Sequence, residues 1–222
     1  MKLSDKAYEG LKRMILSGRF KSDETLSERG LAATLSVSRV PVREAIKELE
    51  SEGLLTVVPR SGVLIRRLTA NEVRELYEVR QAIECMAARL CAARKADLAV
   101  AAMCQRLQLL AKGGAETSHA AIQKASADFH RMLFAVAGNS QLRSVYETIE
   151  PRIQLNLRLT AVHDTSRIDQ ALREHIQIGK AIMRGDARKA EDLTRQHLEN
   201  GKVARLQILA GLAQQGRKAE VA

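Results

Sequence analysis

Apolar residues recur every three or four positions along most of the 222-residue chain, which predicts a mainly α-helical protein. In the first third of the chain this periodicity predicts helices over residues 5–17, 27–35 and 38–53. Two short β-rich apolar runs, LLTVV and VLIRR, then flank a turn at residues 59–62. Three helices followed by a hairpin predict a winged helix-turn-helix domain.

The ends of the second and third helices are marked by local signals. Ser27 and Ser38 are N-cap candidates, and Pro41 suits a first helical turn because it has no backbone N–H to leave unsatisfied. Gly53 stands where a helix commonly ends in a left-handed conformation. The turn between the two helices is expected at Ser36 and Val37.

A capping box from Thr69 to Glu72 predicts a new helix and a domain boundary near residue 68. After it no strand pattern interrupts the chain, and the breaks fall at glycines and polar stretches. Residues 69–222 are therefore predicted to form an all-α bundle of about six helices. The predicted helices span residues 70–94, 97–111, 118–137, 140–162 with a break or kink at Pro151, 166–184 and 186–212, followed by a frayed end.

Composition narrows the fold class and the kind of partner. Hydrophobic residues make up 45% of the chain, enough for a core, but aromatic residues only 3%, which favours an Ala- and Leu-rich bundle over a β-sandwich. The net charge of +10 fits an anionic partner, and no apolar run suits a membrane anchor. Three cysteines without C-x-x-C spacing and an N-terminus without a signal-peptide core indicate a cytoplasmic protein.

In a helix-turn-helix the N-terminal residues of the second helix reach base edges, which here places Ser38, Arg39, Val40 and Arg43 at the DNA. Two arginines one helical turn apart suit either guanine contacts or phosphate binding, and the sequence alone does not distinguish these two roles. The hairpin tip adds Arg60 as a backbone or minor-groove contact. Although a single surface arginine commonly serves only solubility, the whole arrangement favours DNA binding.

The segments SRVPVREA at 38–45 and LESEGL at 49–54, together with the wing glycine, resemble the GntR family of bacterial transcription regulators. The resemblance implies DNA contacts at Arg29, Arg39, Val40, Arg43, Ser61 and Gly62. It also has departures. Val40 stands where a threonine is usual, Ser36 where a glycine is common, and Ser22-Asp23 where Pro-Gly is usual, so the operator preference of relatives does not transfer.

Residues of the second half, including LYEVR at 76–80 and DFHR at 128–131, resemble the all-α ligand-binding domain of the FadR-like branch, the FCD domain. That resemblance implies an effector pocket, dimerisation and a divalent metal such as zinc or nickel. The metal ligands it implies are His130, His175 and His197. The alternative is three separate polar core residues.

The position one turn before His130 usually supplies a fourth, acidic or amide ligand, but Ser126 occupies it here. Asp128 is no simple substitute, because two residues along a helix correspond to a rotation of about 200°. The metal would then be held by three histidines with water or effector oxygens, or the pocket would be metal-free.

Arg80 lies in an apolar stretch of the first bundle helix and, by the resemblance, meets an effector carboxylate. The alternative is an ion pair with Glu84, four residues further on. Arg152 and Asn156 are weaker candidates for the same effector cavity, and Ser126 is assigned to it as well.

These observations predict a regulator that binds double-stranded operator DNA as a homodimer and responds to a small, carboxylate effector. An enzyme is disfavoured, since the chain has no H-E-x-x-H motif, phosphate loop or nucleophile beside a base. A third possibility, an architectural DNA-binding protein without an effector, requires a solid bundle interior. Membrane-surface binding is the competing explanation of the basic charge, and the sequence disfavours it.

Overall fold

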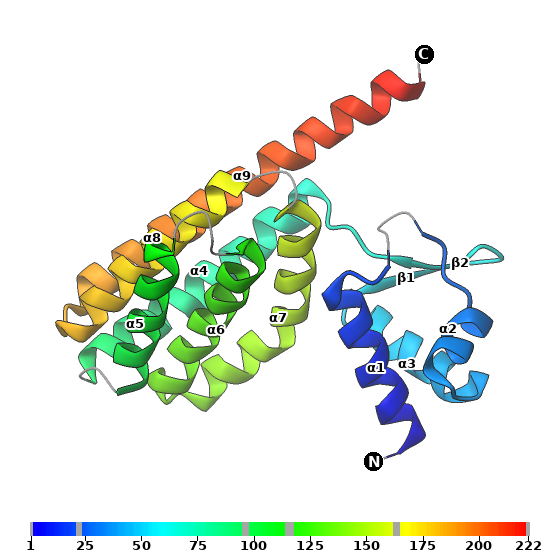
Figure 1. Ribbon diagram of the computed structural model, residues 1–222, viewed down its shortest axis with the longest axis horizontal. Helices are drawn as coiled ribbons and strands as arrows, with labels where there is room; N and C mark the ends of the chain where they lie inside the picture. Colours follow the sequence, from blue (N-terminus) through cyan, green and yellow to red (C-terminus); the bar gives the residue numbers. More distant parts are fainter. Residues whose placement is uncertain (1, 21–23, 95–97, 114–117, 162–164, 221–222) are drawn as a thin grey trace. The chain divides into compact units, whose positions relative to one another are not determined.

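The computed structural model describes residues 2–20, 24–94, 98–113, 118–161 and 165–220, with side chains described as far as residue 212 (Figure 1). The chain forms two compact units. The first comprises Met1–Leu68 and Thr148–Leu159, and the second comprises Thr69–Glu147 and Thr160–Ala222.

The first unit is a winged helix-turn-helix. Its elements are α1 (Leu3–Ser17), α2 (Glu28–Leu35), α3 (Arg39–Ser51), β1 (Leu55–Val58) and β2 (Gly62–Ile65). The strands pair antiparallel, with Leu55 opposite Ile65, and Leu26 adds a bridge to Val63. One apolar core joins the three helices to the hairpin, and it includes Leu155 of the 148–159 segment. The predicted winged domain is confirmed.

The helix ends follow the sequence signals. Ser27 caps α2 by accepting a hydrogen bond from the Gly30 N–H at 3.0 Å. Ser38 occupies the N-cap of α3, although its side chain makes no capping hydrogen bond. Gly53, just beyond α3, has φ +74°, the left-handed conformation that glycine adopts at little cost. The turn residue Ser36 adopts a left-handed conformation too, at φ +54°, without being glycine.

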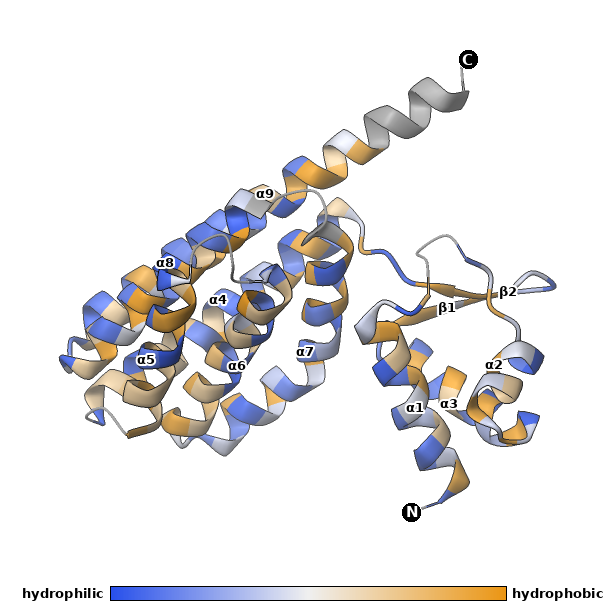
Figure 2. Ribbon diagram, in the orientation of Figure 1, coloured by the Kyte–Doolittle hydropathy of each residue, from blue (hydrophilic) through white to orange (hydrophobic). Residues whose placement is uncertain are grey.

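The described part of the second unit is built from helices alone, as predicted. They are α4 (Ala70–Ala93), α5 (Leu98–Lys112), α6 (His119–Ala137), α8 (Thr165–Met183), α9 (Ala187–Glu220) and the two ends of α7 (Ser140–Ala161), whose residues 148–159 belong to the first unit. The capping box starts α4 as expected: the Glu72 N–H donates to Thr69 Oγ1, and the Thr69 N–H donates to Glu72 Oε2. Apolar and polar residues alternate every few positions along these helices (Figure 2).

Within the bundle, α9 packs along α4 and α8, and α6 lies against α4, α5 and α8 (Figure 1). The candidate residues lie in the interior between α4, α6, α8 and α9. Phe129, Leu133, Ile178 and Leu198 are almost fully buried there.

One predicted helix end and one predicted break were wrong. Helix α7 is not broken at Pro151 but continues through it, because only one intrahelical donor is lost at a proline, whereas the alternative of a kink there stays a prediction. Helix α9 extends to Glu220 rather than ending near residue 212, because Gly211 lowers helix propensity without stopping a helix. Among the described residues, no helix combines the length and apolar character needed to cross a bilayer.

Candidate DNA-binding surface and histidine cluster

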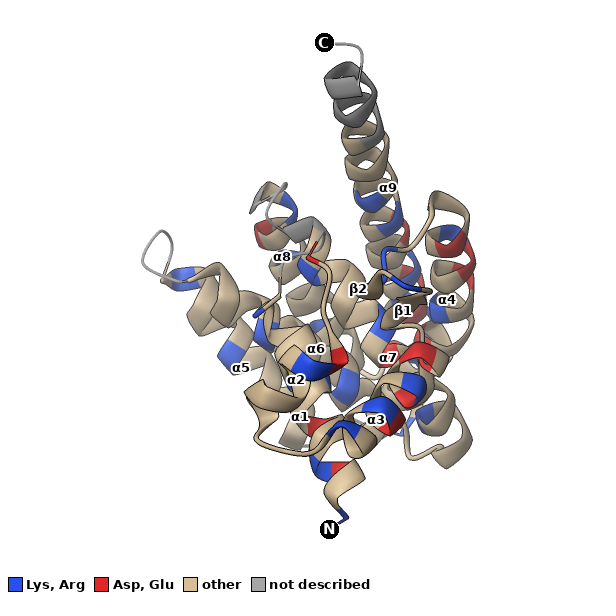
Figure 3. Ribbon diagram, turned by 90° about the vertical axis from the view of Figure 1, so that its right-hand side faces the viewer, with Lys and Arg blue, Asp and Glu red and all other residues tan. Residues whose placement is uncertain are grey.

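The predicted DNA contacts on α2 and α3 lie at the surface of the first unit. Arg29, Arg39 and Arg43 are exposed, and Val40 is 67% exposed although it is apolar. An apolar side chain this open at the start of α3 is consistent with contact to a thymine methyl group. Basic and acidic residues are interleaved along α3 (Figure 3). The individual contacts stay predictions.

The wing tip owes its shape to two residues with positive φ. Arg60 has φ +64° and is exposed, as is Ser61. Gly62 has φ +124°, and a β-carbon there would lie 2.6 Å from the Leu26 carbonyl oxygen. Gly62 is therefore required for the close approach of the Leu26 backbone, whatever it contributes at the DNA.

The structure brings the three predicted metal-ligand histidines together in the bundle interior. His130 comes from α6, His175 from α8 and His197 from α9, and all three are at least 94% buried. His175 Nε2 lies 3.2 Å from His130 Nε2 and 3.1 Å from His197 Nε2. Three ring nitrogens thus converge on one point.

Carboxylates hold the far side of two of these rings. His130 Nδ1 lies 2.6 Å from Glu84 Oε2, and His197 Nδ1 lies 2.6 Å from Glu174 Oε2. A carboxylate this close to Nδ1 favours the tautomer that carries its proton on Nδ1, which leaves the Nε2 lone pair of each ring facing the centre. The Nδ1 of His175 is buried without a hydrogen-bond partner.

Burial favours the neutral form of two rings of the cluster. It lowers the pKa of His175 and His197 well below the usual range, and the neighbouring histidines and Arg167 lower both further. Both rings are therefore neutral at physiological pH, which is the protonation state that a metal ligand requires.

Both carboxylates are in turn held by other side chains. Glu174 accepts hydrogen bonds from Arg167 Nη2 at 2.8 Å and Asn200 Nδ2 at 2.6 Å. Arg167 Nη2 also donates to the His197 carbonyl oxygen at 3.1 Å. The sequence gives no signal for Arg167, Glu174 and Asn200 as partners of this site, since nothing in their spacing points to His197.

Arg80 is 97% buried and donates from Nε to Glu84 Oε1 at 2.6 Å. The ion pair with Glu84 weighed above is thus present, and it connects Arg80 to His130 through one carboxylate. Although burial alone would raise it, Arg80 and His130 hold the pKa of Glu84 well below its usual range. Contact between Arg80 and an effector stays a prediction.

Ser126 lies one turn before His130 on α6 and is half-buried. Asp128 serves a different surface: its carboxylate accepts hydrogen bonds from Arg106, Lys124 and Arg131 at 2.9–3.1 Å. This geometry agrees with the expected rotation of Asp128 away from His130. The carboxylate is already neutralised by three cations.

Arg152 and Asn156 lie on α7 within the segment that belongs to the first unit. Arg152 approaches Gly53 beyond the end of α3. A role for either residue in effector binding stays a prediction.

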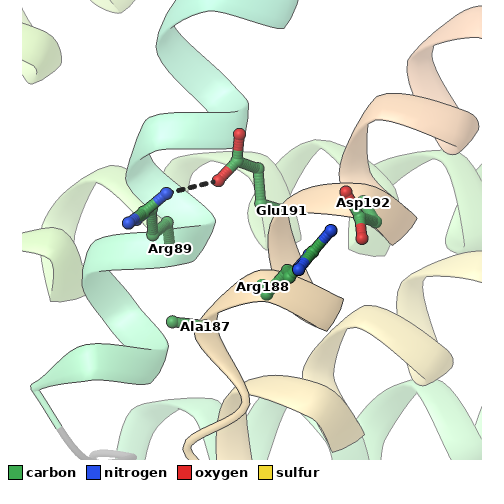
Figure 4. A pocket seen from close by; sticks show the side chains of 5 residues that line it. All are labelled: Arg89, Ala187, Arg188, Glu191 and Asp192. Carbon is green, nitrogen blue, oxygen red and sulfur yellow. Dashed lines mark hydrogen bonds and ion pairs between the residues drawn. The ribbon is translucent and has the colours of Figure 1, made fainter.

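A surface pocket of about 530 Å³ lies between the end of α4 and the start of α9 (Figure 4). Its lining combines Arg89 and Arg188 with Glu191 and Asp192, and Arg89 pairs with Glu191 at 3.1 Å. The opposed charges balance one another. None of the candidate site residues lines this pocket.

Comparison with known proteins agrees with the geometry of both units. Residues 3–65 match the family model described as bacterial regulatory proteins, gntR family, and residues 75–200 match the FCD domain. The Bacillus subtilis protein named uncharacterized HTH-type transcriptional regulator YdhC is 31% identical, over 86% of this chain and 84% of its own. The Escherichia coli repressor RspR is 26% identical, over 89% and 86%.

A solved structure of a putative transcriptional regulator from Rhodococcus sp. RHA1 superimposes with a TM-score of 0.78. The two chains are 25% identical, and the match covers 93% of this chain and 97% of the other. With a match over both its winged domain and its helical bundle, the protein belongs to the GntR family of DNA-binding transcriptional regulators and carries a C-terminal FCD domain.

Proposed function

We propose that this regulator holds a divalent transition metal or zinc ion on His130, His175 and His197, and that a small carboxylate effector bound at this site changes its affinity for operator DNA. The observation that carries the proposal is the convergence of three buried imidazoles in the bundle interior.

The spacing of the three nitrogens fits a metal. Ligand nitrogens about 2.0–2.1 Å from a zinc ion lie about 2.8–3.4 Å apart, from the octahedral to the tetrahedral arrangement. The separations of 3.1 and 3.2 Å between Nε2 atoms fall in this interval.

Hydrogen bonding alone accounts poorly for the cluster. Two Nε2 lone pairs face His175, whose Nε2 carries at most one proton and can satisfy only one of them. The other lone pair would remain buried without a donor, which is costly. A cation at the centre would satisfy all three nitrogens.

Three histidine ligands leave coordination positions for oxygen donors. Bound there, the ion would supply a Lewis-acid centre for a carboxylate oxygen of the effector. Ser126 adds no charge beside His130, so effector or water oxygens would complete the coordination. An effector shifts operator affinity only as far as its own affinity differs between the DNA-binding and non-binding states.

The proposed DNA-binding form is a cytoplasmic homodimer on an inverted repeat. A single winged domain buries little DNA surface, whereas two half-sites read together raise both affinity and specificity. Arg29, Arg39, Val40 and Arg43, with Ser38 and the wing residues Arg60, Ser61 and Gly62, are the proposed contacts.

The test combines metal analysis with DNA binding by the full chain. We expect about one divalent ion per chain after dialysis of purified protein against excess zinc or nickel. The variant His175→Ala should lose the ion, whereas His119→Ala, on an exposed histidine at the start of α6, should keep it. An unchanged metal content in His175→Ala would refute the metal site.

An operator is then obtained by selecting from random duplexes with the wild-type protein. A panel of small carboxylic acids should contain at least one that changes operator affinity in the metal-loaded protein but not in His175→Ala. Sedimentation should show a dimer on a selected inverted repeat. Selection that recovers no preferred sequence would count against operator recognition itself.

A further inference from the structure

A carboxylate lies between the two arginines that begin α3. Glu28 accepts hydrogen bonds from Arg43, from Nε to Oε1 at 3.1 Å and from Nη2 to Oε2 at 2.9 Å. Arg39 Nη2 donates to the same Oε2 at 3.3 Å. One acidic residue of α2 thus contacts both arginines that the proposed function places at the DNA.

The contact with Arg43 occupies only one edge of the guanidinium. Nε and one Nη2 hydrogen face Glu28, so the end of the fork, formed by Nη1 and the second Nη2 hydrogen, points elsewhere. This end presents two parallel N–H donors, the arrangement that a bidentate pair with guanine O6 and N7 requires. Glu28 therefore restricts the guanidinium without blocking its base-reading edge.

The charge of Glu28 is secured by its surroundings. The hydrogen bond from Arg43 lowers the pKa of the carboxyl, and the contact with Arg39 lowers it further, although partial burial opposes both. Glu28 is also the first residue of α2, where the helix dipole favours a negative charge. The carboxylate is anionic at any pH at which DNA binding is measured.

Stability does not account for this arrangement. The side chains of Arg39 and Arg43 are 63% and 56% exposed, and exposed ion pairs stabilise proteins little. An anion beside two arginines also repels the DNA phosphates and lowers affinity for the backbone. A carboxylate there favours contact with a guanine edge, which needs an oriented guanidinium, over contact with a phosphate, which needs only positive charge.

We propose that Glu28 is a specificity-determining residue, which orients Arg43 and Arg39 toward guanine edges and disfavours their contact with phosphates. This inference rests on the proposed role of the two arginines at the DNA. It distinguishes guanine contact from phosphate binding, two roles for which the spacing of the arginines is equally suitable.

The test compares Glu28→Gln with the wild-type protein on a duplex selected by the wild-type protein and on a scrambled duplex of equal length. Glutamine keeps the shape of the side chain and removes its charge. The ratio of specific to non-specific affinity should fall about tenfold, the order expected for one bidentate guanine contact. Non-specific affinity should rise. The slope of log affinity against log salt concentration should become steeper by the amount expected for about one to two additional phosphate contacts.

Glu9→Gln is the matched control, because it makes the same charge change at an exposed position of α1 in the same unit. It should leave the ratio of specific to non-specific affinity at the wild-type value. If both variants lower the ratio equally, the effect is one of net charge and the inference fails. Thermal melts of both variants establish that each is folded.

A second variant tests the coupling directly and does not depend on how well Glu28→Gln folds. Arg43→Lys keeps the charge but loses the fork, so it should also reduce discrimination at guanine positions. In the double variant, Glu28→Gln should cost less than it does alone, because one of its two target arginines has already lost its fork. Fully additive losses would overturn the inference.

Failure of the proposed DNA contacts and failure of the proposed role of Glu28 give different results. If Arg43→Ala and Arg39→Ala leave operator affinity unchanged, the proposed DNA contacts are wrong. If the arginine variants abolish specific binding while Glu28→Gln keeps the wild-type ratio, only the role of Glu28 is refuted. A folded Glu28→Gln variant that loses specific and non-specific binding alike also refutes the role of Glu28, because the carboxylate would then support overall affinity rather than discrimination between DNA sequences.

Discussion

Arg80 donates a hydrogen bond to Glu84 at 2.6 Å, and both side chains are buried in the bundle. The two residues lie one turn apart on α4, a spacing that usually produces a modest surface ion pair. Here the pair lies in the interior, and the second oxygen of Glu84 faces His130 Nδ1 at 2.6 Å. The pair therefore supports one of the proposed metal ligands.

Arg80→Ala should lower the free energy of unfolding by about 3–5 kcal/mol, because it leaves the Glu84 carboxylate buried without its partner. Urea unfolding of the metal-free protein measures the change. Arg89→Ala removes a comparable contact at the surface, where Arg89 is 59% exposed, and should cost less than about 1 kcal/mol. Equal losses in the two variants would contradict the structural role of Arg80.

The sequence was sufficient to predict the fold because its signals are local. Caps at Ser27 and Thr69, the left-handed Gly53 and the turn of the hairpin each act within a few residues, and all are present. The predicted break at Pro151 and the predicted helix end near Gly211 were wrong, because local propensity is unfavourable at both positions but the helix continues.

The partners of the site could not be predicted in the same way. Glu174 and His197 are 23 residues apart in the sequence and meet only because α8 packs on α9. Similarly, Glu28 and Arg43 are 15 residues apart and meet across the turn between α2 and α3. Such pairs depend on packing between helices, and a periodic pattern in one helix does not encode the rotation of the next.

Glu174→Gln should weaken metal binding about 10- to 100-fold, the usual effect of losing a carboxylate behind a histidine ligand. Glutamine can still fill the space, but it can accept the hydrogen bond from His197 Nδ1–H only through a neutral oxygen. Competition with a chromophoric chelator measures the affinity. Glu191→Gln on the same bundle, whose carboxylate pairs with Arg89 at the surface, is the control and should bind metal like the wild type.

The three cysteines should be unreactive in the folded protein. Burial raises the pKa of Cys85 to about 11 and that of Cys91 to about 12, and it raises the pKa of Cys104 as well. Because thiolate is the reactive form and each pKa is raised, the thiols stay protonated near neutral pH and ionise only in strong alkali. At pH 8 a thiol of pKa 11 is about 0.1% thiolate, against about 25% at pKa 8.5.

Labelling with a disulfide reagent at pH 8 should therefore be at least about 100-fold slower for native protein than for protein in urea, where all three thiols become accessible. A single thiol that reacts at the unfolded rate under native conditions would show that its helix opens readily or that it is not buried.

Gly179→Ala should destabilise the bundle, although glycine to alanine in a helix interior ordinarily stabilises by about 1 kcal/mol. A β-carbon at residue 179 would fall well inside van der Waals contact with Cys104 Sγ, across the packed α5–α8 interface. Overpacking of this kind costs about 1–3 kcal/mol. The sulfur is the obstacle, because the Cys104 β-carbon would lie 3.9 Å away, an ordinary contact. Cys104→Ala should therefore rescue Gly179→Ala, and urea unfolding of the two single variants and the double variant gives the coupling. If the double variant is less stable than either single variant, the proposed clash does not explain the loss.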